Sequence, residues 1–465
     1  MRYISTRGEA PAIGFSDAVL AGLAPDGGLY VPETWPSFTA DEIAAFAGRP
    51  YAEVAAAVIG KFAGGEIAAD ELLAMTTDAY ATFAHPAVTP LKELYPGVWL
   101  LELFHGPTLA FKDVAMQILA RLYDHILGRE GSDLTIVAAT SGDTGGAAVE
   151  AFRGRERLRT LILFPEGRIS EVQRRFMTTT GEANVRCVAL QGTFDDCQTI
   201  VKSMFGDLSL RQAVNLSGVN SINWARIAAQ TVYYFTSAVA LGAPHRKVAY
   251  AVPTGNFGDA FAGFVASRMG LPIERIIVAT NANDIVSRAI EDGRYAGGPV
   301  QHTQSPAMDI QIASNFERLY FEATDREALE TARAFRAFAG SGSIGIPPKA
   351  AAAMRQLFSG QSVSEAETSR TIVATFNETG ELIDPHTAVA MAAARRSKRK
   401  PGAAPMIVLS TAHPAKFPEA VTAAAGSAPA LPAACVGLPD KLERFDRLPA
   451  DAETVKAYLR AFAGA

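Results

Sequence analysis

Lys112 is the residue whose surroundings in the sequence most suggest chemistry. It lies at the end of an apolar stretch in residues 104–113, FHGPTLAFKD, and a helical pattern follows it. An amine among apolar neighbours loses hydration, which lowers its pKa and suits it to form a Schiff base with a carbonyl group. Taken alone, such a lysine is more often a surface residue whose stem lies along apolar neighbours.

Residues 141–146, SGDTGG, have the composition of an anion site. They follow an apolar run at 133–139 that is typical of a buried parallel strand, and a helical stretch over 147–155 comes next. Hydroxyls and unpaired N–H groups at a helix N-terminus attract negative charge, and an amino-acid carboxylate would fit there. The alternative is a tight turn that needs glycine for its backbone conformation.

Two further segments place polar groups at the ends of strands. Residues 252–259, VPTGNFGD, join a strand to a helix, and their glycines would let backbone amides approach a phosphate without a Walker lysine; an ordinary turn is the alternative. In residues 408–414, VLSTAHP, hydroxyls follow a strand, and one of them could hydrogen-bond a ring nitrogen. We interpret His413 as a core histidine with satisfied hydrogen bonds.

Together the four segments supply groups that one cofactor would use. They offer an amine for a carbonyl, an anion site for a carboxylate, a phosphate cradle and a hydroxyl for a ring nitrogen. These are the groups that bind pyridoxal 5'-phosphate and an amino-acid substrate.

The elements that must position these groups alternate between strand and helix. Apolar runs predict strands over 133–139, 160–164, 184–190, 247–252, 275–279, 371–376 and 406–409. Helical spacing predicts helices over 113–128, 170–178 and 195–208, the first capped by Asp113 and ended by Gly128. Residues 295–304 and 340–348 are expected to be loops. This alternation predicts an α/β fold with parallel sheets.

Composition excludes several classes of protein. The chain has 465 residues, of which 49% are hydrophobic, so it can form a large core in two or three domains. Its net charge of −5 and the absence of a basic stripe argue against nucleic acid, and we interpret the one basic run, 395–400, as a solvated helix end. Three scattered cysteines predict neither a disulfide framework nor a metal site. Because no apolar stretch reaches the roughly 18 residues of a membrane span, we expect a cytoplasmic protein.

The chain resembles threonine synthases of the longer class with an N-terminal extension, within the tryptophan-synthase-β-like family of pyridoxal-phosphate enzymes. The resemblance spans nearly the whole chain. Besides the segments above, it rests on residues 3–8 (YISTRG), 15–20 (FSDAVL), 23–32 (LAPDGGLYVP), 220–226 (NSINWAR), 305–311 (SPAMDIQ), 314–318 (SNFER) and 410–417 (STAHPAKF). It implies that O-phospho-L-homoserine and water are converted to L-threonine and phosphate.

The resemblance also implies roles for individual residues. Lys112 would hold the cofactor and then move protons at the substrate. The cofactor-binding residues would be Lys112, Gly255, Asn256, Phe257, Asp259 and Thr411. The substrate carboxylate would meet Ser141, Gly142, Asp143 and Thr144. For the substrate phosphate we predict Ser221, Asn223 and Arg226, which offer a hydroxyl, an amide and a guanidinium.

The expected architecture is a tryptophan-synthase-β-like α/β fold with parallel sheets and a helical N-terminal domain. We place that domain at 1–95, a large cofactor-binding domain at 96–135 and 221–465, and a smaller domain at 136–220, with the site between the last two. The expected partner is the small substrate O-phospho-L-homoserine, and the chain is expected to be a monomer or a weak homodimer.

Two other functions stay open from the sequence. A serine or threonine dehydratase on the same scaffold would share Lys112 and the glycine-rich loop but would need no second phosphate site; the long N-terminal domain argues against it. A related protein that binds the cofactor without turnover is the other alternative, and the intact Lys112 argues against that.

Overall fold

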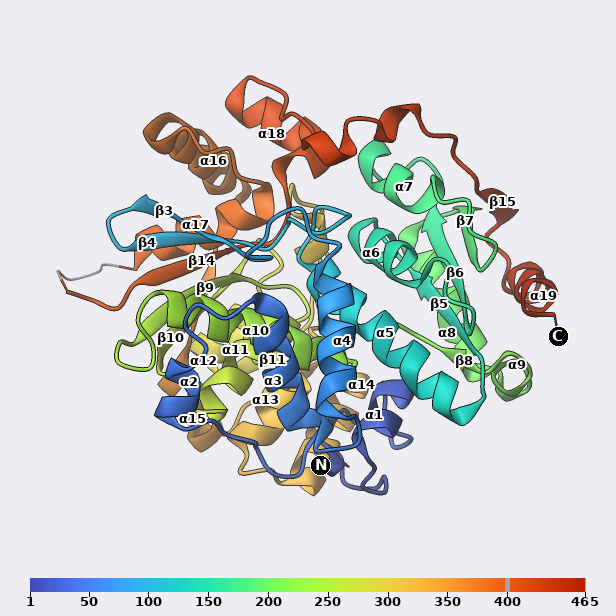
Figure 1. The fold of residues 1–465 in the computed structure, drawn as a ribbon, viewed down its shortest axis with the longest axis horizontal. Coiled ribbons are helices and arrows are strands. Elements are labelled where there is room, and N and C mark those ends of the chain that lie inside the picture. Colours follow the sequence, from blue (N-terminus) through green and yellow to red (C-terminus); the bar gives the residue numbers. More distant parts are fainter. Residues whose placement is uncertain (398–401, 465) are drawn as a thin grey trace.

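Two mostly parallel sheets with helices on both faces form the body of the molecule, seen in the computed structural model in Figure 1. The structure describes residues 1–397 and 402–464. An N-terminal helical region packs on the larger sheet's side of the molecule. The predicted α/β class with parallel sheets is therefore confirmed.

The larger sheet has the strand order β13-β10-β9-β14-β4-β3, and all its pairs are parallel except β3 with β4. Its strands are β3 Leu91–Tyr95, β4 Val98–Glu102, β9 Val248–Pro253, β10 Ile273–Thr280, β13 Phe358–Ser362 and β14 Met406–Ser410. Side chains alternate between the two faces of a strand. Tyr250 and Val252 therefore join the core that contains α10 (Trp224–Ala240) and α11 (Gly258–Arg268), whereas Ala249 and Ala251 pack with α17 (Pro385–Arg396).

The smaller sheet has the strand order β15-β7-β6-β5-β8, all in parallel. Its strands are β5 Leu134–Ala139, β6 Leu158–Pro165, β7 Val185–Gln191, β8 Leu216–Ser217 and β15 Asp446–Pro449. Ile136 and Ala138 share a core with α6 (Asp143–Phe152), and Val137 on the other face packs with α8 (Phe194–Gly206), α9 (Leu208–Val214) and α19 (Ala452–Ala463). Helix α7 (Glu171–Thr178) packs beside α6.

The N-terminal region begins with the antiparallel pair β1 (Tyr3–Ser5) and β2 (Tyr30–Pro32). Its helices are α1 Phe15–Ala21, α2 Ala40–Ala44, α3 Tyr51–Ala63 and α4 Ala69–Tyr80. Helix α3 packs on α10, and α4 packs on α5 (Lys112–Glu130). The Phe62 ring lies 5.4 Å from the Trp224 ring, so aromatic packing joins this region to the base of α10.

The remaining elements surround the larger sheet or connect it to the smaller one. They are α12 Ile285–Asp292, β11 Arg294–Ala296, η1 Pro306–Met308, α13 Phe316–Ala323, α14 Ala328–Ser341, β12 Ser343–Gly345, α15 Pro348–Leu357, α16 Glu365–Thr379, η2 Pro414–Lys416, α18 Pro418–Ala425, η3 Ala433–Cys435 and η4 Leu438–Asp440. Strands β11 and β12 form an antiparallel pair, so the two segments expected to be loops each contribute a short strand.

The predicted strand over 371–376 is wrong, because these residues lie within helix α16. The segment is rich in β-branched residues, which favour strands. Its buried residues Thr368, Thr371, Ile372 and Thr375 nevertheless recur at helical spacing, and Ser364 caps the helix. The edge of the sheet is instead formed by β13, which lies just before this helix.

Both predicted ends of the helix after Lys112 are also wrong. Helix α5 begins at Lys112, and Asp113 accepts hydrogen bonds from the Thr108 amide and hydroxyl instead of capping the helix. The helix continues through Gly128 to Glu130 and ends at Gly131, which has a φ of 67°. A left-handed residue at this position is the usual helix stop.

The predicted domain boundaries stay a prediction, with one amendment. Strand β15 pairs with β7, so residues near the C-terminus belong to the smaller sheet and not, as expected, to the large domain. Figure 1 shows the C-terminal segment, in red, running across the top of the molecule to that sheet.

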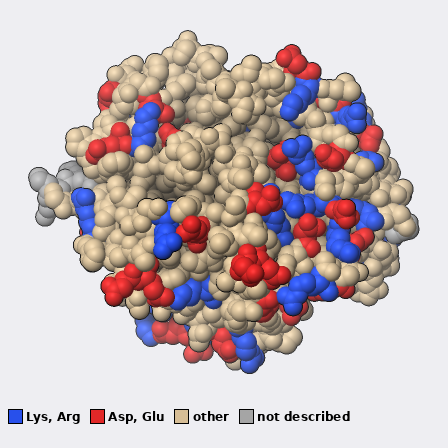
Figure 2. All heavy atoms as spheres, in the orientation of Figure 1, with Lys and Arg blue, Asp and Glu red and all other residues tan. Residues whose placement is uncertain are grey.

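Several general expectations can be compared with the structure. The part of the chain that is described holds no helix long and apolar enough to cross a membrane, and no group of side chains that could hold a metal ion. Cys187, Cys197 and Cys435 are buried and free. Helix α17 ends at Arg396, within the basic run, and residues 398–400 of that run lie outside the described residues. On the face in Figure 2, basic and acidic side chains are interspersed.

Candidate active site between the two sheets

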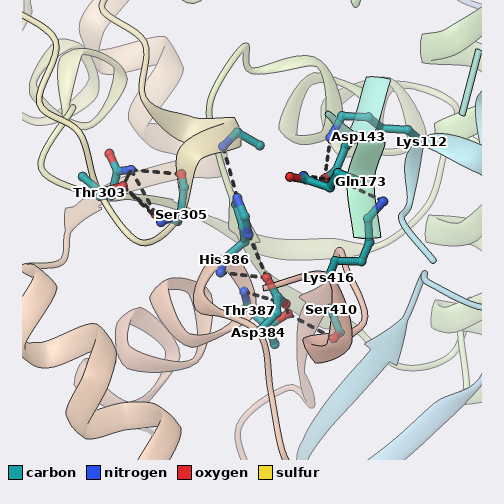
Figure 3. Close-up of polar contacts among 12 residues, drawn as sticks. Lys112, Asp143, Gln173, Thr303, Ser305, Asp384, His386, Thr387, Ser410 and Lys416 are labelled. Carbon is teal, nitrogen blue, oxygen red and sulfur yellow. Dashed lines mark hydrogen bonds and ion pairs between the residues drawn. The ribbon is translucent and has the colours of Figure 1, made fainter. Parts of the chain in front are cut away.

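Lys112 lies at the first position of α5, in the region where the two sheets approach one another (Figure 3). Its side chain is buried, and its Nζ lies 3.4 Å from Asp143 Oδ2 and 4.9 Å from the centre of the Phe111 ring. Burial lowers the pKa of Lys112, Asp143 opposes that shift, and the charges of Lys416 and Arg226 add to it. A buried amine with a lowered pKa is what Schiff-base chemistry needs, so the interpretation as a surface lysine is wrong.

A backbone bridge holds the Lys112 segment against the end of β14. The Phe111 amide donates to the Thr411 carbonyl at 2.8 Å, and the His413 amide donates to the Leu109 carbonyl at 3.0 Å. Leu109 has a positive φ of 59°, which turns the chain into α5. The structure therefore brings Lys112 and Thr411 together, although they are far apart in the sequence. Thr411 is buried at this junction.

The 141–144 segment forms the N-terminus of α6, as expected for an anion site. Thr140 Oγ1 accepts hydrogen bonds from the Gly142 and Gly145 amides, at 3.0 and 2.9 Å. The amides of Asp143 and Thr144 lie in the first turn, where a helix cannot supply acceptors. Ser141 is exposed and Thr144 is half-buried, so this end of the helix is accessible.

Gly142 is needed for close packing as well as for its backbone conformation. Its φ is 137°, and a Cβ atom there would lie 2.5 Å from Gln173 Cδ. Gln173, on α7, donates through Nε2 to Asp143 Oδ1 at 3.0 Å. The glycine thus makes room for the amide that orients Asp143.

Asp143 binds two lysines with its side chain. Oδ1 lies 2.7 Å from Lys416 Nζ, and Oδ2 is the atom that faces Lys112. Burial alone would raise the pKa of Asp143, but Lys416 and Lys112 outweigh it and hold that pKa well below its usual range. Because its carboxylate is committed to cations, Asp143 can offer a substrate carboxylate only its backbone amide.

The glycine-rich loop before α11 has the geometry of a phosphate cradle. Phe257 adopts a left-handed φ of 64° immediately before the helix, and a Cβ on Gly255 would lie 2.8 Å from the Ala307 carbonyl oxygen. Asn315 fastens the loop by donating its side-chain and backbone N–H groups to the Asn256 carbonyl, at 3.2 and 3.1 Å. A loop held this way presents backbone amides at the start of a helix, where a phosphate binds favourably.

Asp259 has a packing role in the structure. Its Oδ1 accepts hydrogen bonds from the Tyr233 and Tyr234 hydroxyls on α10, at 2.6 and 3.0 Å, and its Oδ2 is buried without a partner among the described residues. Burial raises its pKa to about 6 despite these two donors. A direct contact between this carboxylate and a phosphate would be repulsive, so any contribution from Asp259 would come from its backbone amide.

The three residues predicted to bind a second phosphate have different surroundings. Asn223 caps α10 through Oδ1 and donates through Nδ2 to the Val19 carbonyl and the Tyr123 hydroxyl. Both N–H groups of its amide are therefore used within the protein, and the predicted role of Asn223 in substrate binding stays a prediction. Ser221 is half-buried beside it, and its carbonyl accepts from Asn315.

Arg226 is the strongest anion-binding candidate of this group. Its guanidinium is buried, donates once to the Val219 carbonyl at 3.0 Å, and carries an Nε that has no partner among the described residues. Burial lowers its pKa to about 10. A buried cation with an unused donor is costly unless an anion binds it, so the arrangement favours a ligand with negative charge.

A polar network that the sequence did not predict supports the end of β14 (Figure 3). Ser410 Oγ lies 3.0 Å from Thr387 Oγ1, and Thr387 also hydrogen-bonds Asp384. Asp384 is fully buried and accepts from His386 Nδ1 at 2.7 Å, while His386 Nε2 accepts from the Ala307 amide. The network joins the residue before Thr411 to the segment behind the glycine-rich loop.

A cleft of about 690 Å³ opens beside the Lys112 segment. Its wall includes Gly106, Leu109, Phe176 and His413. His413 is half-buried and lines this cleft, so the interpretation as a core histidine is wrong, although its Nδ1 does accept from the Ala415 amide at 3.2 Å. Burial lowers its pKa to about 4. A small molecule could reach this side of the segment from solvent.

Comparison with known proteins identifies relatives along the whole chain. Family models match at residues 2–80 (threonine synthase N terminus), 83–361 (pyridoxal-phosphate dependent enzyme) and 387–459 (threonine synthase, C-terminal). A threonine synthase from Pseudomonas aeruginosa is 50% identical over 460 residues, which cover 99% of this chain and 98% of the relative.

Solved structures agree with these matches. The crystal structure of pyridoxal-phosphate-bound threonine synthase from Brucella melitensis has a TM-score of 0.98 at 54% identity and covers both chains completely. Yeast threonine synthase has a TM-score of 0.94 at 37% identity, covering 100% of this chain and 99% of that one. The expected fold type is confirmed.

Proposed function

Because the chain belongs to the threonine synthase family of pyridoxal-phosphate-dependent enzymes, we propose that this site converts O-phospho-L-homoserine and water into L-threonine and phosphate. Within that family assignment, the observation that carries the proposal is the pair of buried cations. Lys112 supplies the cofactor amine, and Arg226 supplies an unused donor for the substrate's own phosphate.

The residues present fit pyridoxal phosphate. The loop with Gly255, Asn256 and Phe257 would hold its phosphate through backbone amides, and Thr411 would face its ring nitrogen from the end of β14. When bound, the cofactor supplies an electron sink that stabilises negative charge on substrate carbon. The hydroxyl of Thr411 is neutral and can donate to an unprotonated ring nitrogen, so it does not require a charged ring.

Lys112 would move the protons of the reaction. With the cofactor and substrate bound, its amine would accept a proton from one substrate carbon and deliver it to another. Burial and the nearby cations Lys416 and Arg226 lower its pKa, so a larger fraction of the amine is neutral and able to act as a base.

The two negative groups of the substrate would bind at separate places. The first turn of α6 would take the carboxylate through the Asp143 and Thr144 amides, with the Ser141 hydroxyl beside them. The phosphate would take the free Nε of Arg226, with Ser221 near the start of α10. A substrate held at both ends has its reacting carbons fixed between these anchors.

The need for a second phosphate site separates this proposal from a dehydratase. Serine and threonine carry one negative group, the carboxylate, and no phosphate. They would therefore leave Arg226 without an anionic partner. The buried guanidinium with a free Nε is therefore the specific observation that favours the phosphorylated substrate.

The test is phosphate release from O-phospho-L-homoserine, with the amino-acid product identified by chromatography. We expect phosphate and L-threonine in equal amounts from the yellow enzyme, and neither from a Lys112→Ala variant, which should also lose the visible absorbance. Formation of oxobutyrate from threonine, with no phosphate released from O-phospho-L-homoserine, would favour the dehydratase. A coloured protein that turns over neither substrate would favour a binding function.

The remaining expectations belong to this proposal. We expect the enzyme to act in the cytoplasm on a small-molecule substrate, as a monomer or a weak homodimer. Sedimentation velocity at several protein concentrations would measure the oligomeric state.

A further inference from the structure

Lys416 is a second buried lysine in the site, and the proposed reaction does not yet use it. It lies in η2, just after β14, and only 1% of the residue is exposed. Its Nζ donates to the Thr108 carbonyl and pairs with Asp143 Oδ1, both at 2.7 Å, and it lies 5.4 Å from the centre of the Phe176 ring. A buried ammonium is retained only where its hydrogen bonds and charge are satisfied.

These contacts join the two sheet domains. Lys416 follows a strand of the larger sheet, whereas Asp143 begins α6 beside the smaller sheet. Ser170, which caps α7, donates through its hydroxyl to the Lys416 carbonyl at 3.3 Å. The side chain and the carbonyl of Lys416 therefore both bind the small domain.

The same contacts fix the carboxylate that faces Lys112. Oδ1 of Asp143 receives Lys416 and Gln173, so the plane of the carboxylate is held by donors from both domains. Oδ2 is then left to face Lys112 Nζ at 3.4 Å. Figure 3 shows Lys416 and Lys112 approaching Asp143 from different elements.

We propose that Lys416 is a positioning residue, which holds Asp143 beside Lys112. It thereby links the position of the small domain to the environment of the Lys112 amine. This inference rests on the proposed function, because it assigns a role in the same reaction. Lys416 acts through Asp143 and needs no contact with the substrate or the cofactor.

Loss of Lys416 would change the charge balance around Lys112. The charged and titratable groups that face this cluster include Lys112, Asp143 and Lys416 themselves, Arg226 from α10, Asp113 from α5 and Cys435 from η3. Without the charge of Lys416, the Asp143 carboxylate has Lys112 as its remaining cationic partner, and this favours the protonated form of the Lys112 nitrogen. A merely structural lysine would affect unfolding without moving this titration.

The experiment compares Lys416→Met, Lys416→Gln and Lys416→Arg holoenzymes with the wild type. The visible absorbance of the bound cofactor is titrated with pH, and kcat and KM are measured for O-phospho-L-homoserine. The exposed Lys349, which pairs with Asp325 at the surface, provides the control variant Lys349→Met.

We expect both neutral variants to raise the midpoint of the absorbance titration by about one to three pH units. Their kcat should fall by about 100-fold, the effect of misplacing a reacting group by about 1 Å, with a smaller change in KM. Lys416→Arg should keep the midpoint near that of the wild type, because it keeps the charge, and Lys349→Met should change nothing.

Three outcomes would overturn the inference. The first is a midpoint that stays in place in the neutral variants while their melting temperatures fall. The second is unchanged kcat in either neutral variant. The third is that neither neutral variant folds, which would make Lys416 a structural residue. If the wild type itself releases no phosphate from O-phospho-L-homoserine, the proposed function fails instead, and the absorbance titration still tests the contact with Asp143.

Discussion

Replacing Arg226 with methionine should weaken substrate binding without weakening the fold. Arg226 is buried, and among the residues that the structure describes it pairs with no carboxylate and makes one hydrogen bond, to the Val219 carbonyl. Methionine is unbranched, flexible and uncharged, so it fills the space of the arginine stem without the charge. The two effects of the change have opposite signs and can be measured separately.

The effect on stability follows from the lowered pKa. A shift from 12.5 to about 10 means that the folded state binds the proton of Arg226 less tightly than the unfolded state does. The unfolded state therefore holds more protons between these two pKa values, stability rises with pH there, and the whole penalty is present at pH 7. At 1.36 kcal/mol per pKa unit the penalty is about 3 kcal/mol. The lost hydrogen bond, worth roughly 1 kcal/mol, offsets part of the gain, so the variant should be at least as stable as the wild type.

The effect on binding follows from the lost contact with phosphate. A hydrogen bond to a charged group contributes about 2 kcal/mol, so KM for O-phospho-L-homoserine should rise roughly 30-fold. If the contact strengthens as the phosphate leaves, kcat should fall as well.

Urea unfolding of the cofactor-free protein and steady-state phosphate release measure the two effects. The control is Arg121→Met, because Arg121 is also buried but is satisfied by Asp78 and Gln117. That variant should unfold more readily and keep its KM. The reasoning would be refuted if Arg226→Met lost stability as Arg121→Met does while its KM and kcat stayed at the wild-type values.

Three other predictions concern two glycines and one buried acid. Gly142→Ala should destabilise the protein by about 1–3 kcal/mol in urea unfolding, because of its φ of 137° and the clash with Gln173. Gly128→Ala, in the last turn of α5 where a Cβ has open space, should stabilise the protein slightly, and equal effects of the two changes would contradict this reasoning. Asp259 has a raised pKa of about 6, so wild-type stability should fall by about 1 kcal/mol between pH 5 and pH 7.5 on its account, and Asp259→Asn should lose that part of the pH dependence. Pyridoxal phosphate at 100 times its Kd should stabilise the cofactor-free protein by about 3 kcal/mol in thermal unfolding. Gly255→Ala should abolish most of this stabilisation, because the added Cβ would lie against the Ala307 carbonyl. Full stabilisation of the variant would argue against the phosphate cradle.

The sequence was informative wherever a local pattern determines a local conformation. Short apolar runs became the parallel strands on either side of the site, and the segments at 141–146 and 252–259 lie at helix N-termini, as predicted. The resemblance to threonine synthases agrees with the family matches. The roles of the individual site residues stay predictions.

The failed predictions have different physical causes. At 371–376 two local signals compete, because the β-branched residues favour a strand, whereas the helical spacing of the buried residues and the Ser364 cap indicate the helix that the structure shows. Asp113 looks like a helix cap, but its partner Thr108 lies in the preceding loop. Lys416 carried the same signal as Lys112, a lysine in an apolar segment, and could have been found by that signal; its partner Asp143 could not.

Strand β15 also limits how the small domain can move. The chain passes between the two sheets three times: from α5 into β5, from β8 into α10, and through the residues before β15. A domain that is connected to the rest of the chain at three separate points cannot rotate freely, and only a small rigid-body rotation keeps all three connections unchanged. The last part of the chain therefore restrains the small domain. Removing residues 446–464 should widen the range of domain positions and also uncover the side chains that Val455 and Leu459 cover, while leaving Lys112, Asp143 and Lys416 in the chain.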